Sequence, residues 1–342
     1  MALTGSAVRA IGTPHVRPAS AGWRPGSPRW HSDPVSSDPV SAMTASRRLP
    51  TPDGYHLSGS VRSLAVGSHD PCARFVDGEF WWATRTADGP AVLRLAIDGT
   101  DLVATGYGPG AGAVVDRADF IAGLRDDPTG FASLAKHHPV IARLARHHRG
   151  VRFPATGEVF RPLLRAILEQ KVAIVEAHRA YRAVARHFGE PAPGPVTLLL
   201  PPDPGRVAET AYWVFHPFGV EQRRTQTLLR AAVQAARLER CTDAADATRR
   251  LTAIPGIGPW TAAETVRTAY GDPDAVSVGD YHIPNTVTWA LAGEPRGTDE
   301  RMLELLEPFR GHRGRVCGLL AAGGIMAPRF GPRMPIRSFA RF

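Results

Sequence analysis

The most informative part of the chain is residues 251–285, which read LTAIPGIGPWTAAETVRTAYGDPDAVSVGDYHIPN. Ile254 leads into two glycines separated by one residue, and a helix is predicted from Pro259, because proline suits the first helical turn. Glycine permits positive φ and places no Cβ between its amide and a ligand. We therefore expect a hairpin between two helices, with bare N–H groups that can hold a phosphate.

A carboxylate follows this hairpin at a set distance along the chain. Asp280 lies 22 residues after Gly258, beyond one predicted helix and the turn Gly271-Asp272-Pro273. A phosphate-binding hairpin and a carboxylate held at a fixed separation from it suggest chemistry on a nucleic acid. The alternative is an ordinary turn, with Asp280 only capping the helix from Tyr281. The two roles are compatible, because a cap would hold the carboxylate rigidly.

The pattern resembles the helix-hairpin-helix-Gly/Pro-Asp superfamily of base-excision DNA glycosylases, and within it the bacterial DNA-3-methyladenine glycosylase II family. The resemblance is carried by residues 254–258, by Trp260-Thr261-Ala262 and by Gly279-Asp280-Tyr281, in that order and spacing. It implies an α+β fold. A mostly helical helix-hairpin-helix core in two helical subdomains would follow a small antiparallel sheet domain of the TATA-binding-protein type.

The resemblance also implies roles for individual residues. Asp280 would be catalytic, stabilising positive charge on the sugar and orienting or deprotonating the attacking water. The base pocket would include Trp260, Tyr281, Glu264 and His282. The DNA backbone would be held by Ile254, Pro255, Gly256, Ile257, Gly258 and Thr261.

A second informative segment, residues 161–172, resembles the family's helix pair, whose junction carries a residue that wedges into the DNA stack. Gln170 and Lys171 occupy that junction. The alkyl stem of Lys171 could fill the gap left by an extruded base while its ammonium group meets a phosphate. The alternative for Lys171 is a solvated surface side chain.

Two departures from the family leave the substrate range less determined than the reaction type. Glu264 stands where well-known members have an aromatic pocket residue, and residues 315–318 lack the aromatic that sandwiches the base. Trp260 also occupies the place of the Schiff-base lysine of related glycosylase-lyases. We therefore expect a monofunctional enzyme without lyase activity.

The predicted function is a DNA glycosylase that hydrolyses the N-glycosidic bond of alkylated purines, of the 3-methyladenine type, in base excision repair. The main alternative is a non-catalytic helix-hairpin-helix protein that binds DNA lesions. An iron–sulfur glycosylase is disfavoured, because Cys72, Cys241 and Cys317 lie far apart. We expect no metal site and no required cofactor, although the resemblance implies a monovalent cation on the hairpin carbonyls.

Composition agrees with a nucleic-acid partner. The 342 residues carry a formal net charge of +9, and all but two of the 41 basic Lys and Arg residues are arginine. Arginine pairs well with phosphate, although an arginine-rich genome would also raise the ratio of arginine to lysine. The expected partner is double-stranded DNA with damaged bases. We expect a monomer in the bacterial cytoplasm, at the nucleoid, with no membrane association.

The chain is predicted to divide into four parts. Residues 1–50 contain seven prolines and no hydrophobic period, and are expected to be disordered. Residues 51–130 contain two Asp-Gly hairpin signals, at Asp77-Gly78 and Asp98-Gly99, and form the α+β domain. Residues 131–330 form the helical glycosylase domain, and 331–342 a basic tail.

Two interpretations within these parts remain open, and one further helix is predicted. Trp81 and Trp82 could stack on bases, but an aromatic pair on a short strand is more often core. Arg223 and Arg224 could touch phosphates or simply be an exposed helix end. Residues 131–149 are expected to form one helix with a basic outer face.

Overall fold

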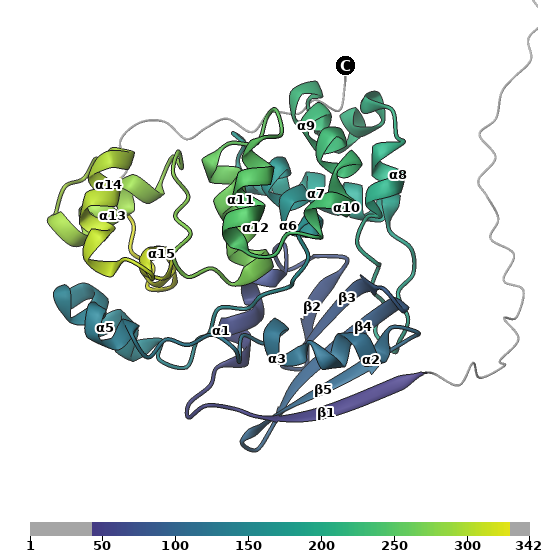
Figure 1. Cartoon of the computed structure of the whole chain (residues 1–342), viewed down its shortest axis with the longest axis horizontal. Helices are drawn as coiled ribbons and strands as arrows, with labels where there is room; N and C mark the ends of the chain where they lie inside the picture. Colours follow the sequence, from purple (N-terminus) through teal and green to yellow (C-terminus); the bar gives the residue numbers. More distant parts are fainter. Residues whose placement is uncertain (1–42, 329–342) are drawn as a thin grey trace, which may run out of the picture. The chain divides into compact units, whose positions relative to one another are not determined.

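A computed structural model describes residues 43–328 of the chain. The fold is of the predicted α+β class. A five-stranded antiparallel sheet, in the order β1-β5-β4-β3-β2, precedes a series of helices (Figure 1). The strands are β1 Thr44–Pro50, β2 Ala73–Val76, β3 Glu79–Thr86, β4 Gly89–Asp98 and β5 Asp101–Tyr107.

Both predicted hairpins are confirmed. Asp77 and Gly78 have φ of 51° and 83°, and they connect β2 to β3 in a register that pairs Val76 with Glu79. Asp98 pairs with Asp101 across the turn between β4 and β5. Asp and Gly tolerate the positive φ that two-residue hairpin turns need.

The expected disordered extension over residues 1–50 is wrong for its last residues, because Thr44–Pro50 forms β1 and pairs with β5. Only Leu49 of this edge strand is buried. Arg48 donates to Asp98 and Asp101 at 2.8 and 3.1 Å, which holds the strand to the sheet beyond its backbone bonds. Residues 1–42 and the predicted tail, 331–342, lie outside the described residues.

The sheet buries both of its faces. On one face, Trp82 packs in a cluster that includes residues of α2 (Ala111–Asp116). On the other, Trp81 packs with Leu198 and Leu200 from a later irregular segment. Trp81 and Trp82 are 5% and 1% exposed, which supports their interpretation as core residues. The remaining helices of this part are α1 Leu57–Val61, η1 Arg62–Leu64 and α3 Ala118–Ile121.

The helices after residue 130 pack around two hydrophobic clusters. The first group supplies Leu163, Val184, Leu228 and Val266 among others. Its helices are α6 Phe160–Glu169, α7 Ile174–Phe188, α8 Pro204–Ala208, η3 Tyr212–Phe218, α9 Gln222–Val233, α10 Ala235–Leu238, α11 Ala244–Thr252 and α12 Pro259–Tyr270. The second group's helices are α4 Phe131–Leu134, η2 Ala135–His137, α5 Pro139–His147, α13 Ile283–Ala292, α14 Asp299–Leu306, η4 Glu307–Phe309 and α15 Arg313–Ala322.

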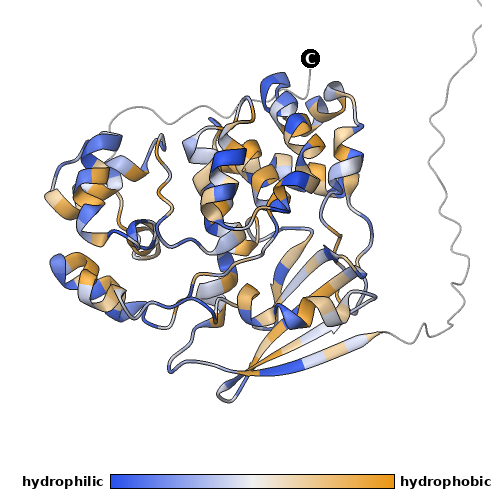
Figure 2. Ribbon diagram, viewed as in Figure 1, coloured by the Kyte–Doolittle hydropathy of each residue, from blue (hydrophilic) through white to orange (hydrophobic). Residues whose placement is uncertain are grey.

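Figure 2 shows hydrophilic and hydrophobic residues mixed along these helices, as expected when one face of each is buried. The single helix predicted over residues 131–149 is wrong. His138 is extended, with φ −143° and ψ 130°, because the residue before a proline disfavours helical backbone. No helix in residues 43–328 is both long and apolar enough to cross a membrane.

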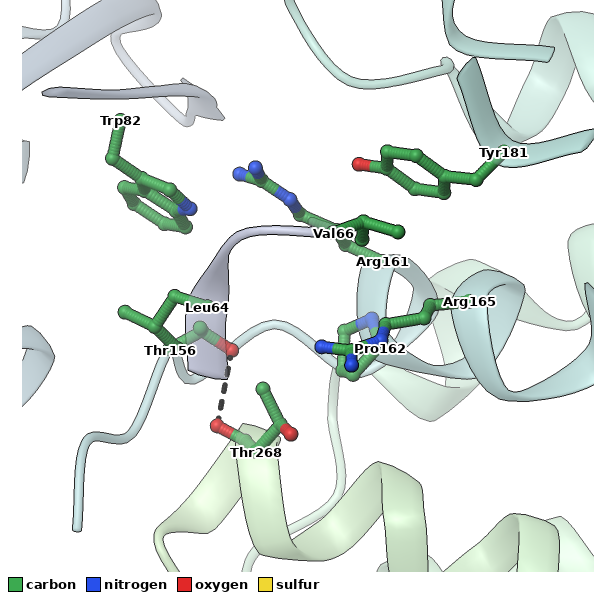
Figure 3. Close-up of a pocket in the computed structure, with 9 residues that line it drawn as sticks. All are labelled: Leu64, Val66, Trp82, Thr156, Arg161, Pro162, Arg165, Tyr181 and Thr268. Carbon is green, nitrogen blue, oxygen red and sulfur yellow. Dashed lines mark hydrogen bonds between the residues drawn. The ribbon is translucent and has the colours of Figure 1, made fainter. Parts of the chain in front are cut away.

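A cavity of about 20 Å³ lies between the sheet and the first helix group, lined by Trp82, Arg161, Tyr181 and Thr268 among others (Figure 3). The guanidinium carbon of Arg161 lies 4.7 Å from the centre of the Trp82 ring. The cavity has room for about one water molecule and contains none of the predicted site residues. It is therefore separate from the predicted base pocket.

Candidate nucleic-acid interface and active site

The expected hairpin lies between α11 and α12 (Figure 1). Ile254 and Ile257 are 1% and 5% exposed and anchor it in the first hydrophobic cluster. Pro255 and Gly256, which lie between them, are exposed. The two buried isoleucines hold the ends of the turn, and the backbone between them faces outward, as the sequence predicts.

The two hairpin glycines have different functions. Gly256 has φ +99°, and any Cβ there would clash with the Thr227 side chain. Gly258 has φ −103° and open space around a Cβ position, so the prediction of positive φ is wrong for it. One left-handed residue suffices for the turn, and α12 begins from extended backbone. Within residues 43–328 the amides of Gly256 and Gly258 donate to no protein acceptor.

The predicted wedge lies against this hairpin, although it is far away in sequence. α6 ends at Glu169, and the side-chain amide of Gln170 donates to the Gly256 carbonyl at 3.0 Å and to Thr261 Oγ1 at 2.9 Å. Lys171 follows, exposed and with φ of 53°. A lysine in left-handed backbone is strained, and such strain is concentrated at functional positions. The turn therefore presents Lys171 beside the exposed amides.

Asp280 lies in the connection between α12 and α13. Its Oδ2 accepts from the indole N–H of Trp260 at 2.9 Å. Its Oδ1 accepts from the backbone N–H groups of His282 and Ile283, at 2.7 and 2.8 Å, where α13 (Ile283–Ala292) begins. Three donors thus fix both carboxylate oxygens, and two helices position them. The helix expected from Tyr281 begins at Ile283 and has His282 as its N-cap residue, so the position predicted for the cap is wrong, although the Asp280 carboxylate still binds two amides at the start of the helix. The contact with Trp260 was not indicated by the sequence.

The other predicted pocket residues differ in burial. Trp260 is partly buried and reaches Asp280 through its N–H. Tyr281 is 76% exposed, and its ring lies edge-on to the exposed His282, with centroids 4.9 Å apart. Thr261 is buried and accepts from the Gln170 amide. Tyr281 and His282 are accessible to a ligand that approaches Asp280.

Glu264 lies one turn after Trp260 on α12. One carboxylate oxygen accepts from the Ser277 hydroxyl and the other pairs with Arg267. Ser277 also accepts from the Asp280 amide, through its carbonyl, at 3.2 Å. The loop before Asp280 is therefore tied to α12 at Glu264 as well as at Trp260.

Cys317 of α15 lies near the same charged groups. Burial raises the pKa of its thiol to about 12, and the charges of Arg267, Glu264 and Asp280 also act on it. An arginine nearby lowers this pKa and the two carboxylates raise it. The thiol is therefore not a nucleophile at neutral pH.

Sequence reasoning did not identify Arg267, Ser277 or Cys317. The spacing of Glu264 and Arg267, three residues apart on a helix, would have indicated their pairing. Ser277 lies in a loop and carries no such signal. The possible phosphate contact at Arg224 is wrong. Its side chain is buried, and Nη1 donates to the Leu168 carbonyl at 2.8 Å, at the end of α6.

No protein-family model matches the chain. Curated proteins do. The chain is 26% identical to the probable bifunctional transcriptional activator/DNA repair enzyme AlkA of Mycobacterium tuberculosis over 267 residues, 71% of this chain and 50% of that protein. It is 27% identical to DNA-3-methyladenine glycosylase 2 of Escherichia coli over 178 residues, 50% of this chain and 61% of that protein. The chain thus spans about half to three-fifths of these relatives.

Solved structures share the fold. The 3-methyladenine DNA-glycosylase from Archaeoglobus fulgidus superimposes with a TM-score of 0.70 and 15% identity, over 80% of this chain and 97% of that one. The 8-oxoguanine glycosylase/lyase of Clostridium acetobutylicum, in complex with double-stranded DNA, superimposes with a TM-score of 0.62 and 14% identity, over 79% and 93% of the two chains. The resemblance inferred from residues 254–281 is confirmed.

Proposed function

Because the chain is a relative of the DNA-3-methyladenine glycosylase II family, in sequence and in fold, we propose that it is a DNA glycosylase acting on alkylated purines. The observation that carries the proposal is the carboxylate of Asp280. It is fixed by Trp260 and by the amides of His282 and Ile283, and it connects through α12 to a hairpin with free amides.

The hairpin would bind the DNA backbone. The free amides of Gly256 and Gly258 can donate to a phosphate, and the start of α12 adds favourable helix-dipole charge. The turn at Gln170 is attached to the same hairpin, so Lys171 would enter the duplex close to the bound phosphate. Extruding a base loses stacking, and the lysine stem would offset part of that loss.

The N-glycosidic bond would break with its electron pair leaving on the base. An alkylated purine is cationic and becomes neutral as it leaves, so no strong general acid is required. The ionised Asp280 would stabilise the positive charge that develops on the sugar. Water would then bond to C1′ and release its proton, with Asp280 orienting it or accepting that proton.

Monofunctional chemistry is part of the proposal. Trp260 occupies the position where related glycosylase-lyases carry a Schiff-base lysine, and its N–H instead holds Asp280. The product would be an uncut abasic strand. The protein would act as a monomer on double-stranded DNA that contains damaged bases.

The proposal also includes a monovalent cation bound to the hairpin carbonyls. Neutral carbonyls suit such an ion, although those of Pro255 and Gly256 already accept from Arg230 and Gln170. No step of the reaction depends on it. DNA affinity at constant ionic strength in K⁺, Na⁺ or tetramethylammonium tests for it, since the last ion is too large to be held by a tight turn.

The decisive experiment measures base release from methylated duplex DNA by the wild type and by Asp280→Asn. The variant should lose release by at least about a thousandfold and bind DNA as well or better, because a negative charge near the phosphates is gone. Asp272→Asn is the matched control, since the hydrogen bond that this aspartate accepts comes from the Asp274 amide, away from Asp280. It should leave release unchanged.

Three other results would contradict parts of this proposal. Unchanged release by Asp280→Asn would remove this carboxylate from the mechanism. Tight binding to lesion-containing duplexes without any base release by the wild type would indicate a non-catalytic lesion-binding protein, with Asp280 only holding the start of α13. Strand cleavage without added alkali or heat would contradict the monofunctional proposal.

A further inference from the structure

The pair Glu264 and Arg267 places a carboxylate and a guanidinium beside the proposed catalytic group. Their side chains are 17% and 30% exposed, so both are largely enclosed yet accessible. Glu264 lies four residues after Trp260, and side chains at that spacing share one face of a helix. Since Trp260 contacts Asp280, this face of α12 is directed toward the catalytic carboxylate.

A second contact path joins the pair to Asp280. Ser277 donates its hydroxyl to Glu264 and accepts the Asp280 amide on its carbonyl. The contact of Trp260 with Asp280 and the contacts of Ser277 therefore place the pair near the proposed catalytic carboxylate.

Glu264 and Arg267 retain acceptors and donors that no described residue uses. A carboxylate has about four lone-pair sites. Glu264 uses two of them, for Ser277 and Arg267, among the described residues. Arginine has five N–H donors in a planar fork, and only Nη2 of Arg267 contacts Glu264. Together the two side chains offer acceptors next to donors.

The Watson–Crick edge of guanine is complementary to that arrangement. It presents the O6 acceptor next to two donors, N1–H and N2–H₂. Adenine presents one donor, N6–H₂, next to the N1 acceptor, whose lone pair would face a carboxylate. A ligand that leaves a polar group of an enclosed site unpaired binds much more weakly than a similar ligand that pairs with it.

We propose that Glu264 and Arg267 read the Watson–Crick edge of an extruded guanine, so that this site favours N-alkylated guanine over N-alkylated adenine. Glu264 accepts from N1–H and N2–H₂, and Arg267 donates to O6. The inference rests on the proposed function and concerns the substrate class of the same site. Glu264, which stands where the family has an aromatic pocket residue, would then determine the specificity of the site.

The test uses DNA treated with dimethyl sulfate, which carries both 7-methylguanine and 3-methyladenine, and follows the release of both bases in one reaction. The two bases differ in how readily they leave, so the informative quantity is the ratio of their release rates. Glu264→Gln should lower the 7-methylguanine to 3-methyladenine ratio by roughly tenfold. Glu294→Gln, which alters another arginine-paired glutamate, should leave the ratio unchanged.

Arg267→Lys provides a second perturbation that retains the charge but loses the planar fork, and it should also lower the ratio. An unchanged ratio in both variants, or an equal loss of both bases, would overturn the inference while the proposed function stands. No release of either base by the wild type would instead refute the proposed function. If Glu264→Gln does not fold, Arg267→Lys decides the matter.

Discussion

Replacing Gly256 with alanine should destabilise the protein, for two reasons that can be separated. The backbone there has φ +99°, which residues with a Cβ rarely adopt. The new Cβ would also overlap Thr227 Oγ1 and approach its Cγ2 and Cβ at 3.0 and 3.1 Å. Thr227 is buried, and its hydroxyl donates to the Arg223 carbonyl at 3.0 Å, so it cannot move aside freely.

The backbone strain should cost about 1–2 kcal/mol and the overpacking about 1–3 kcal/mol, so the loss should be about 2–5 kcal/mol. Gly258→Ala is the matched control. Gly258 has φ −103° and no heavy atom within 4 Å of a Cβ. Its stability should change by less than about 0.5 kcal/mol. The added methyl group would nevertheless stand beside the amides that we propose to bind phosphate, so DNA affinity should fall.

Urea unfolding of four proteins measures these contributions: the wild type, Gly256→Ala, Thr227→Ala and the double variant. The double variant should recover the packing part of the loss and retain the backbone part, so the two substitutions should couple by about 1–3 kcal/mol. A Gly256→Ala variant as stable as the wild type would refute the reasoning. Additive effects would refute the contact with Thr227.

Lys171→Gly should raise the free energy of unfolding by up to about 1 kcal/mol, because it relieves left-handed backbone, and should slow base release, because the proposed wedge is lost. Urea unfolding and single-turnover release measure the two effects, and a loss of stability would contradict the first. Trp260→Phe should slow release about tenfold or more with DNA affinity unchanged, since Asp280 Oδ2 loses its donor. Equal loss of affinity would assign Trp260 to DNA binding instead. Burial lowers the pKa of His148 and His178 below 6.5. As the pH falls, the unfolded chain therefore binds protons before the folded chain, so the Tm should decrease between about pH 7 and 5.5. A rising Tm would contradict this assignment.

Features encoded by short local signals could be predicted from the sequence. The hairpin turn at Asp77-Gly78 and the helix beginning at Pro259 follow from backbone preferences of the residues concerned. The helix junction at Gln170 was placed by resemblance, and the binding of Asp280 to an amide at a helix start by its residue type.

Features that depend on distant partners could not be predicted. β1 has a single buried residue, Leu49, so it carries no alternating pattern, and it becomes a strand only because β5 offers an edge. Arg224 looks like a surface residue at a helix start, yet it is buried because the carbonyl end of α6 needs a donor there. The contact between Ser277 and Glu264 joins a loop to a helix face, which no local pattern indicates.

The geometry of Asp280 connects its contacts at the start of α13 with its proposed catalytic function. Of its three donors, the Trp260 indole belongs to the helix group that carries the hairpin, and the amides of His282 and Ile283 lie where α13 of the other group begins. The direction of the carboxylate is therefore set by both groups at once. A change in the packing of either group would alter the carboxylate even if every DNA-contacting residue were kept. An aspartate held in this way, rather than a free one, suits the proposed reaction, because the position of the charge is determined before the substrate binds.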